Sequence, residues 1–201
     1  MKTLCLDSAH KHLVIVLIED GIIKACYEQE CWKRQSETLF PQLIQCMSEA
    51  GWQSEDIDQV VITDGPGSYT GVRIAMSVAK VFCTTMNKPL FCVSTCQLYA
   101  GLRPHCYVML DARSKRAYFA HYHEGKQIDA EQILTLGEVA AIAAKNDGVW
   151  VGDCELIQRS SEPLHLAQQF CVILPFARKV ENIHTLTPRY LKDSDAYKVR
   201  K

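Results

Sequence analysis

The clearest candidate for chemistry in this sequence is a glycine-rich segment in the first half of the chain. It runs from Gly65 to Arg73, reads GPGSYTGVR, and follows a run of β-branched residues that ends at Thr63. A glycine-rich turn at the start of a helix presents unpaired backbone N–H groups and the positive end of the helix dipole, and these together bind anions. The segment lacks the Gly-Lys-Ser/Thr ending of a P-loop and the third glycine of a dinucleotide-binding loop. A phosphate site is therefore one interpretation, and a structural turn whose helix is capped by Ser68 or Thr70 is the one we favour.

Two aspartates could complete such a phosphate site, because each ends the expected first strand of one half of the chain. Asp7 and Asp111 are carboxylates of the kind that hold Mg²⁺ beside nucleotide phosphates. The alternative, which we favour, is that each aspartate caps the turn after its strand. Arg113 follows Asp111 closely and could neutralise it. The full set of candidate phosphate-site residues is Asp7, Ser8, Gly65, Gly67, Thr70, Gly71 and Asp111.

Other catalytic signatures are missing from the sequence. No two of the seven histidines stand four apart, and the pairs His10/His12 and His121/His123 offer two ligands each, which is too few for a metal site. We therefore expect surface histidines and no bound metal. The ten cysteines include no Cys-x-x-Cys, and no Gly-x-Ser-x-Gly elbow occurs. We expect reduced structural thiols, no catalytic residue and no cofactor.

An internal repeat organises the elements that would position these residues. A shift of 104 positions places Leu6-Asp7 on Leu110-Asp111 and Asp20-Gly21 on Glu124-Gly125 without a gap. Asp-Gly between apolar runs is a strong hairpin signal, and chance similarity of two hairpins is the alternative to a repeat. In the first half we expect strands over 3–7, 12–19, 22–29, 57–63 and 89–93, with helices over 37–50, 71–87 and from about 94. In the second half we expect strands over 107–111, 117–123, 127–133, 149–151 and 171–174, with helices over 136–145 and, broken near Pro163, 155–170.

The repeat predicts an α/β protein of two tandem βββαβα lobes, a first over 1–102 and a second, shortened one over 103–201. A hairpin meander followed by a helix and a crossover strand gives a mixed sheet with helices on it. Tandem lobes of this kind form the actin-like, ribonuclease-H-like fold of ATPases and sugar kinases, in which a nucleotide lies between the lobes. A nucleotide-binding ATPase is therefore the alternative function, and ATP turnover by the isolated chain would reveal it.

Two helices of the first lobe carry apolar seams that could meet a partner. The second of them repeats apolar residues at steps of three and four, which is a heptad seam. Periodicity alone leaves open whether these faces pack inside the chain or against another protein. The residues we assign to a partner or dimer interface are Leu39, Leu43, Met47, Val72, Ala75, Met76, Ala79 and Phe82.

The composition limits the class of protein further. The 201 residues are 48% hydrophobic and 22% charged, which is ordinary for a globular protein with a core and excludes a disordered chain. The formal net charge is −1, so the chain does not have the excess of basic residues that is typical of a protein that binds nucleic acid alone. The basic end, 197–201, is expected to be a solvated terminus. No apolar run approaches the roughly 20 residues of a membrane span, so we expect a cytoplasmic protein without a membrane contact.

The glycine segment closely resembles the signature Gly-Pro-Gly-Ser-Phe-Thr-Gly-Leu-Arg of the TsaB family, also called YeaZ. Shorter stretches that resemble the same family run in order along the chain, at 6–8, 36–41, 111–118 and 188–192. Three positions depart from the family pattern: Gln35 replaces a histidine, and His10 and Lys11 replace small polar residues in the first turn.

The resemblance implies a two-lobed actin-like fold and a function in tRNA modification. TsaB proteins are cytoplasmic bacterial proteins that pair with their paralogue TsaD. With the ATPase TsaE they help to install threonylcarbamoyl on N6 of adenosine 37 in tRNAs that read codons starting with A. TsaD carries the transferase site and its metal, so the resemblance implies a non-catalytic scaffold that meets tRNA only through the complex. Its first-lobe helices form the surface that pairs with TsaD, or with a second copy when the protein is alone.

Overall fold

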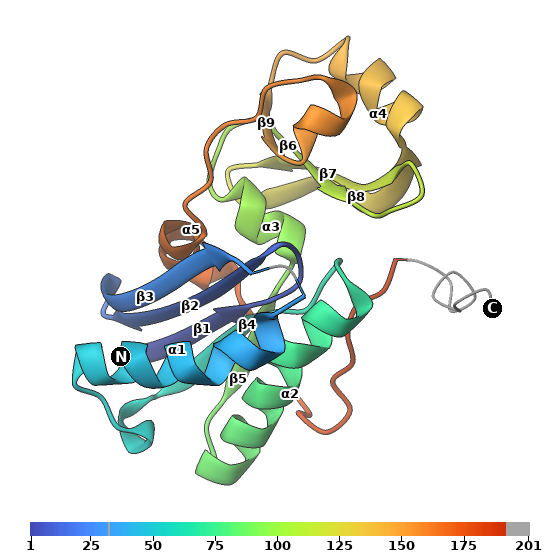
Figure 1. Cartoon of the computed structure of the whole chain (residues 1–201). Coiled ribbons are helices and arrows are strands. Elements are labelled where there is room, and N and C mark those ends of the chain that lie inside the picture. Colours follow the sequence, from blue (N-terminus) through green and yellow to red (C-terminus); the bar gives the residue numbers. More distant parts are fainter. Residues whose placement is uncertain (32, 192–201) are drawn as a thin grey trace, which may run out of the picture.

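The computed structural model describes residues 1–31 and 33–191, and it is an α/β protein with two sheets (Figure 1). The basic end at 197–201 lies outside the described residues, as does the last part of the expected second lobe. None of the helices within the described ranges has the length and apolar character needed to cross a membrane.

The first sheet has six strands in the order β10-β5-β4-β1-β2-β3. Its strands are β1 (Lys2–Asp7), β2 (His12–Glu19), β3 (Ile22–Glu30), β4 (Gln59–Thr63), β5 (Leu90–Val93) and β10 (Arg178–Lys179). The first three form an antiparallel meander, whereas β4 and β5 run parallel to β1. Asp20 and Gly21 have φ angles of 50° and 82°, which is the conformation of a two-residue hairpin turn.

The second sheet repeats this meander with four strands in the order β8-β7-β6-β9. Its strands are β6 (Cys106–Asp111), β7 (Arg116–His123), β8 (Lys126–Thr135) and β9 (Val149–Gly152). Glu124 and Gly125 again adopt positive φ, at 48° and 77°, and β9 again runs parallel to the first strand of the meander. The predicted repeat and the two-lobed α/β fold are therefore confirmed.

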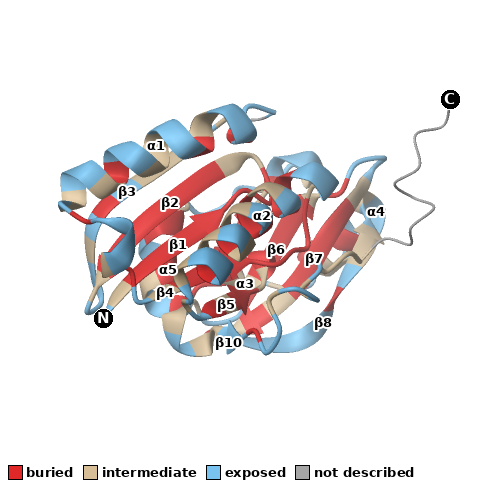
Figure 2. Ribbon diagram, turned by 90° about the horizontal axis from the view of Figure 1, so that it is seen from below, coloured by how far each residue is buried: buried red, intermediate tan, exposed pale blue. Residues whose placement is uncertain are grey.

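Within the described residues, five α-helices cover the two sheets. They are α1 (Gln35–Ala50), α2 (Tyr69–Met86), α3 (Thr95–Ala100), α4 (Leu136–Ala143) and α5 (Leu166–Ile173). The buried residues of α1 and α2 pack on one face of the first sheet, and those of α3 and α5 join the core between its other face and the second sheet (Figures 1 and 2). Helix α4 covers the outer face of the second sheet. Gly51 ends α1 in the left-handed conformation, with φ at 67°.

The structure corrects the expected strand over 171–174. Residues up to Ile173 belong to α5, because Leu166, Phe170 and Ile173 recur at helical spacing and are fully buried. Helix α5 packs against β2 and β3, and β10 pairs with β5, so this part of the chain lies on the first sheet. The division into two lobes at residue 102 stays a proposal. Residues 166–179 follow that boundary in the sequence but pack on the sheet of the first lobe.

Candidate functional site

The segment from Gly65 to Gly71, which we call the glycine turn, packs against Ser8 and Ala9 in the turn that follows β1. The backbone N–H of Ser68 donates to the carbonyl oxygen of Ala9 at 2.8 Å, and the Ser68 hydroxyl caps α2 by accepting from the N–H of Gly71. The Ser8 hydroxyl donates to the carbonyl of Gly71 at 2.6 Å and accepts from the N–H of Ala75 at 3.1 Å. These contacts fix where α2 begins relative to β1.

The glycines of this turn are required by close packing. A methyl group at Gly67 would overlap the carbonyl of Ala9, and one at Gly71 would overlap the carbonyl of Ser8. Gly65 has a φ of 111°, a backbone conformation that favours glycine. The hydroxyl of Tyr118 reaches across from β7 and donates to the carbonyl of Gly67 at 3.1 Å. These contacts support the structural interpretation of the turn over a phosphate cradle.

The two candidate aspartates both hold their own turns. Asp7 is buried, and its Oδ1 accepts from the N–H of Ala9 at 3.0 Å and from the Thr63 hydroxyl. Burial raises the pKa of this carboxyl. The Oδ1 of Asp111 accepts from the N–H of Arg113 at 2.8 Å, and the Arg113 guanidinium lies 3.3 Å from the other oxygen. Each carboxylate therefore occupies the turn-capping position that was the alternative to Mg²⁺ binding.

A cluster that the sequence did not reveal joins the two lobes beside these turns. The Nε2 of His10 lies 2.7 Å from Oδ2 of Asp153, and the ammonium group of Lys11 lies 2.5 Å from Oδ1. The N–H of Asp111 donates to the same carboxylate at 2.6 Å. Burial opposes ionisation of Asp153, yet its hydrogen bonds with His10 and Lys11 hold its pKa well below the usual range. The expectation of surface histidines is wrong for His10, which is 5% exposed.

The predicted partner surface on α1 and α2 needs a correction. Five of the eight residues that we assigned to it are buried inside the protein, because they pack on the first sheet. These residues are Leu39, Val72, Ala75, Met76 and Ala79. The heptad seam of α2 therefore belongs to the protein's own core. The remaining members, Leu43, Met47 and Phe82, are only partly buried.

An exposed apolar face lies next to this seam. Phe40 and Ile44 on α1 are 56% and 69% exposed, and Val81 on α2 is 68% exposed. Two neighbouring cavities of about 520 and 470 Å³ run along this face and share Phe40, Leu43 and Phe82 in their walls. We call these residues, with Ile44, Met47, Val78 and Val81, the α1–α2 face.

The described part of the chain holds no group of three or more His, Cys, Asp or Glu residues that could bind a metal ion. Cysteines are dispersed, and burial raises the pKa of buried thiols such as Cys83 and Cys154 to about 12. Thiols with such pKa values are inert nucleophiles at neutral pH.

Comparison with known proteins places the chain in a family. Residues 29–149, more than half of the chain, match the profile of the family described as TsaD: tRNA N6-adenosine threonylcarbamoyltransferase. The tRNA threonylcarbamoyladenosine biosynthesis protein TsaB of Bacillus subtilis is 28% identical over 126 residues, which is 61% of this chain and 55% of that protein. The protein of the same name from Escherichia coli is 27% identical over 128 residues, with the same shares. This chain thus spans about 55% of the length of these curated relatives.

A solved structure matches almost the whole fold. YeaZ from Pseudomonas aeruginosa superimposes with a TM-score of 0.79 over 94% of this chain and 99% of that chain, at 20% sequence identity. The paired meanders and this match define a two-lobed α/β protein of the actin-like, ribonuclease-H-like class. Within that class, the chain belongs to the TsaD-type family and, inside it, to the TsaB (YeaZ) proteins.

Proposed function

We propose that this chain is a non-catalytic partner subunit in the biosynthesis of threonylcarbamoyladenosine in tRNA. In this proposal it acts in the cytoplasm, pairs with a TsaD-type transferase and works with the ATPase TsaE to modify N6 of adenosine 37 in tRNAs that read codons starting with A. The names of its TsaB relatives support the pathway. It would contact tRNA through the complex and form a homodimer when alone.

The observation that carries the proposal is the α1–α2 face. Phe40, Ile44 and Val81 expose more than half of their side chains on adjacent helices, beside two apolar cavities. Large apolar side chains gathered in this way on a surface mark a protein–protein contact, because burying them removes apolar area from water. A partner helix laid along the face would fill the cavities and cover the three exposed side chains.

The non-catalytic role rests on how the candidate catalytic groups are used. Asp7 and Asp111 hold their own turns, and the glycine turn is packed against Ala9. The transferase chemistry would then belong to the TsaD-type partner.

Reconstitution tests this division of labour. The chain is incubated with threonylcarbamoyl-adenylate and unmodified tRNA, alone and with the TsaD-type and TsaE-type proteins of the same organism, and digested tRNA is examined for the modified nucleoside. We expect product only when the partners are present. Product from the chain alone would overturn the non-catalytic assignment, and full activity of the partners without the chain would overturn its role.

The alternative function is a nucleotide-binding ATPase of the actin and sugar-kinase class, with phosphate held by the turn from Gly65 to Gly71. The cluster of His10, Lys11 and Asp153 argues against it, because these side chains bond to one another between the lobes, where this class holds its nucleotide. The Lys11 ammonium, which could otherwise bind a phosphate, is already paired with Asp153. Sustained ATP hydrolysis by the isolated chain would favour the alternative.

A further inference from the structure

A separate cavity, of about 290 Å³, lies between the two sheets on the side of β4 and β5. The polar residues that line it include Asp64, Ser94, Gln97, Gln127, Arg178 and Arg189. Asp64 and Ser94 directly follow the parallel strands β4 and β5. Crevices at the carboxyl ends of parallel strands are where open α/β sheets bind ligands.

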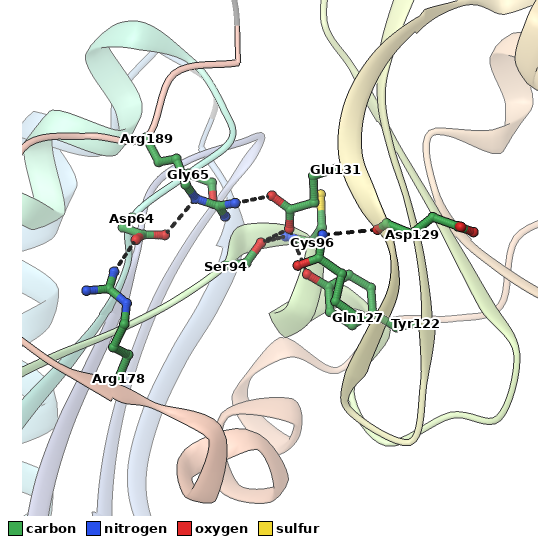
Figure 3. A network of polar contacts seen from close by, with 10 residues as sticks. All are labelled: Asp64, Gly65, Ser94, Cys96, Tyr122, Gln127, Asp129, Glu131, Arg178 and Arg189. Atoms are coloured by element: carbon green, nitrogen blue, oxygen red, sulfur yellow. Dashed lines mark hydrogen bonds and ion pairs between the residues drawn. The ribbon is translucent and has the colours of Figure 1, made fainter.

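A row of alternating charges, shown in Figure 3, begins in the wall of this cavity. The guanidinium of Arg178 lies 3.0 Å from Asp64, and Asp64 lies between Arg178 and Arg189, whose Nε is 3.6 Å away. Arg189 also contacts Glu131, a carboxylate whose side chain is 1% exposed. Glu131 in turn accepts from the hydroxyl of Tyr122 at 2.7 Å and from that of Ser94. Each carboxylate therefore has an arginine beside it, Arg178 at Asp64 and Arg189 at Glu131.

One end of the row is Arg178, a cation that lines the cavity. The Arg178 side chain is 64% exposed, and its bond to Asp64 uses only Nη2. A guanidinium has five N–H donors. Asp64 is the one hydrogen-bond acceptor that the described residues supply to Arg178. The remaining donors of this exposed arginine, which lines the cavity, suit an incoming anion.

Two amide side chains offer acceptors to the same cavity. The Nε2 of Gln97 donates to the carbonyl of Gly125 at 2.9 Å, and the Nε2 of Gln127 donates to the carbonyl of Asp129 at 3.0 Å. Each bond uses one of the two N–H groups of its amide. Within 1–31 and 33–191, no hydrogen bond is made to the amide oxygen of either glutamine. Each oxygen can accept from an O–H or N–H group.

We propose that this cavity binds a small metabolite with one anionic group, held by Arg178, and with hydroxyl or amino groups that donate to Gln97 and Gln127. Its volume lies near the lower limit of roughly 300–1,000 Å³ for small-molecule sites, so the ligand is small. The site is separate from the α1–α2 face and independent of the proposed function. The anion is a carboxylate or a phosphate, and the guanidinium recognises both.

Calorimetric titration of the full chain with simple probes tests the site. The probes are sn-glycerol 3-phosphate, D-glycerate, inorganic phosphate and, as the uncharged control, glycerol. We expect glycerol 3-phosphate or D-glycerate to bind with a dissociation constant in the millimolar range or lower. The probe that binds more tightly identifies the anion as phosphate or carboxylate. Glycerol should not bind. Failure of all three anions to bind would overturn the proposal.

A matched pair of arginine variants locates the binding. Arg178→Gln removes the cation at the mouth, and Arg113→Gln removes an arginine of similar exposure, 62%, that also pairs with an aspartate. We expect Arg178→Gln to weaken binding of the anions roughly tenfold, since a hydrogen bond to a charged group is lost, and Arg113→Gln to leave it unchanged. Equal effects of the two variants would show a nonspecific charge effect and contradict the site.

A second variant tests the acceptors without touching the charges. Gln127 is exposed, so Gln127→Ala should leave the fold intact, which the circular dichroism spectrum checks. We expect it to weaken binding of glycerol 3-phosphate and D-glycerate, whose hydroxyls reach the amide, and to spare inorganic phosphate. Unchanged affinity for both hydroxyl-bearing probes would remove the glutamines from the proposal.

Discussion

At Gly67 the backbone of the glycine turn approaches the carbonyl of Ala9 so closely that a side chain has no room. The sequence could predict that this position needs glycine, but it left two reasons open, a phosphate ligand or a close backbone contact. The structure favours the second reason, because the neighbour is part of the protein itself. The contact partner is 58 positions away in the chain, so local sequence could not supply it.

Gly67→Ala should therefore destabilise the fold. We expect a loss of about 1–3 kcal/mol in the free energy of unfolding, as for other additions to a tightly packed site. Gly137→Ala is the matched control, because nothing lies within 4 Å of the added carbon, and in helix α4 alanine should be neutral or slightly stabilising. Urea unfolding measures both variants, and equal stabilities would contradict the packing explanation.

The buried Asp153 carboxylate should make the free energy of unfolding depend on pH. Its pKa is lower in the folded protein than the value near 3.9 of an unfolded chain, so it contributes stability above about pH 4 and loses it as the pH falls toward the folded pKa. Asp153→Asn should cost about 2–3 kcal/mol at pH 7, because His10 and Lys11 lose their anion.

The difference in unfolding free energy between wild type and Asp153→Asn should shrink as the pH drops below about 4. Urea unfolding across this range measures it, with the exposed Asp147→Asn as a control that should behave like wild type throughout. A difference that stays constant from neutral to acidic pH would mean that the ionised carboxylate is not what stabilises the cluster.

At the scale of elements, the segment over 178–191, which we call the C-terminal strap, ties α2 to both lobes. Lys80 on α2 donates to the carbonyls of His184 and Leu186, at 3.1 and 2.9 Å. Farther along, the Arg189 side chain donates to the carbonyl of Gly65 at 2.8 Å and pairs with Glu131 on β8. The strap therefore holds the glycine turn from outside and bridges to the second sheet.

Removing the Arg189 charge should destabilise the protein through its buried partner. Arg189→Met leaves Glu131 without a cation, and we expect a loss of about 2–4 kcal/mol, somewhat below a fully buried pair because Arg189 is 37% exposed. In a Glu131→Gln background the same change should cost less, because no buried charge is left unpaired. A double-mutant cycle from urea unfolding measures the coupling, and strictly additive losses would contradict an ion pair between the two residues.

Sequence patterns predicted most elements of this fold but not how every apolar face is buried. The meanders and most helices were predictable from hairpin turns and apolar periodicity. The seam of α2 was not assignable, because Ala75 and Ala79 have the same spacing whether they face a sheet or a partner. At the end of α5, the run from Cys171 to Leu174 is apolar enough for a strand, but the buried helical positions Phe170 and Ile173 keep the chain helical up to Ile173.

For the whole molecule, the repeat of the meander predicted two lobes, whereas the contacts between the lobes had no local signal. His10 and Asp153 are 143 positions apart, and Arg189 and Glu131 are 58 apart. Such pairs form only when the sheets have packed, so composition and spacing do not reveal them. Both pairs fasten the lobes together.

The dissociation constant of the complex with the TsaD-type protein of the same organism tests directly whether the α1–α2 face binds this partner. It is measured for wild type, for Val81→Glu on the α1–α2 face, and for Val172→Glu, the same change at an exposed position of α5. We predict that wild type and Val172→Glu bind alike and that Val81→Glu weakens binding at least about thirtyfold, because a carboxylate would be buried in an apolar interface. Equal binding by all three proteins, or no complex with wild type, would contradict the account.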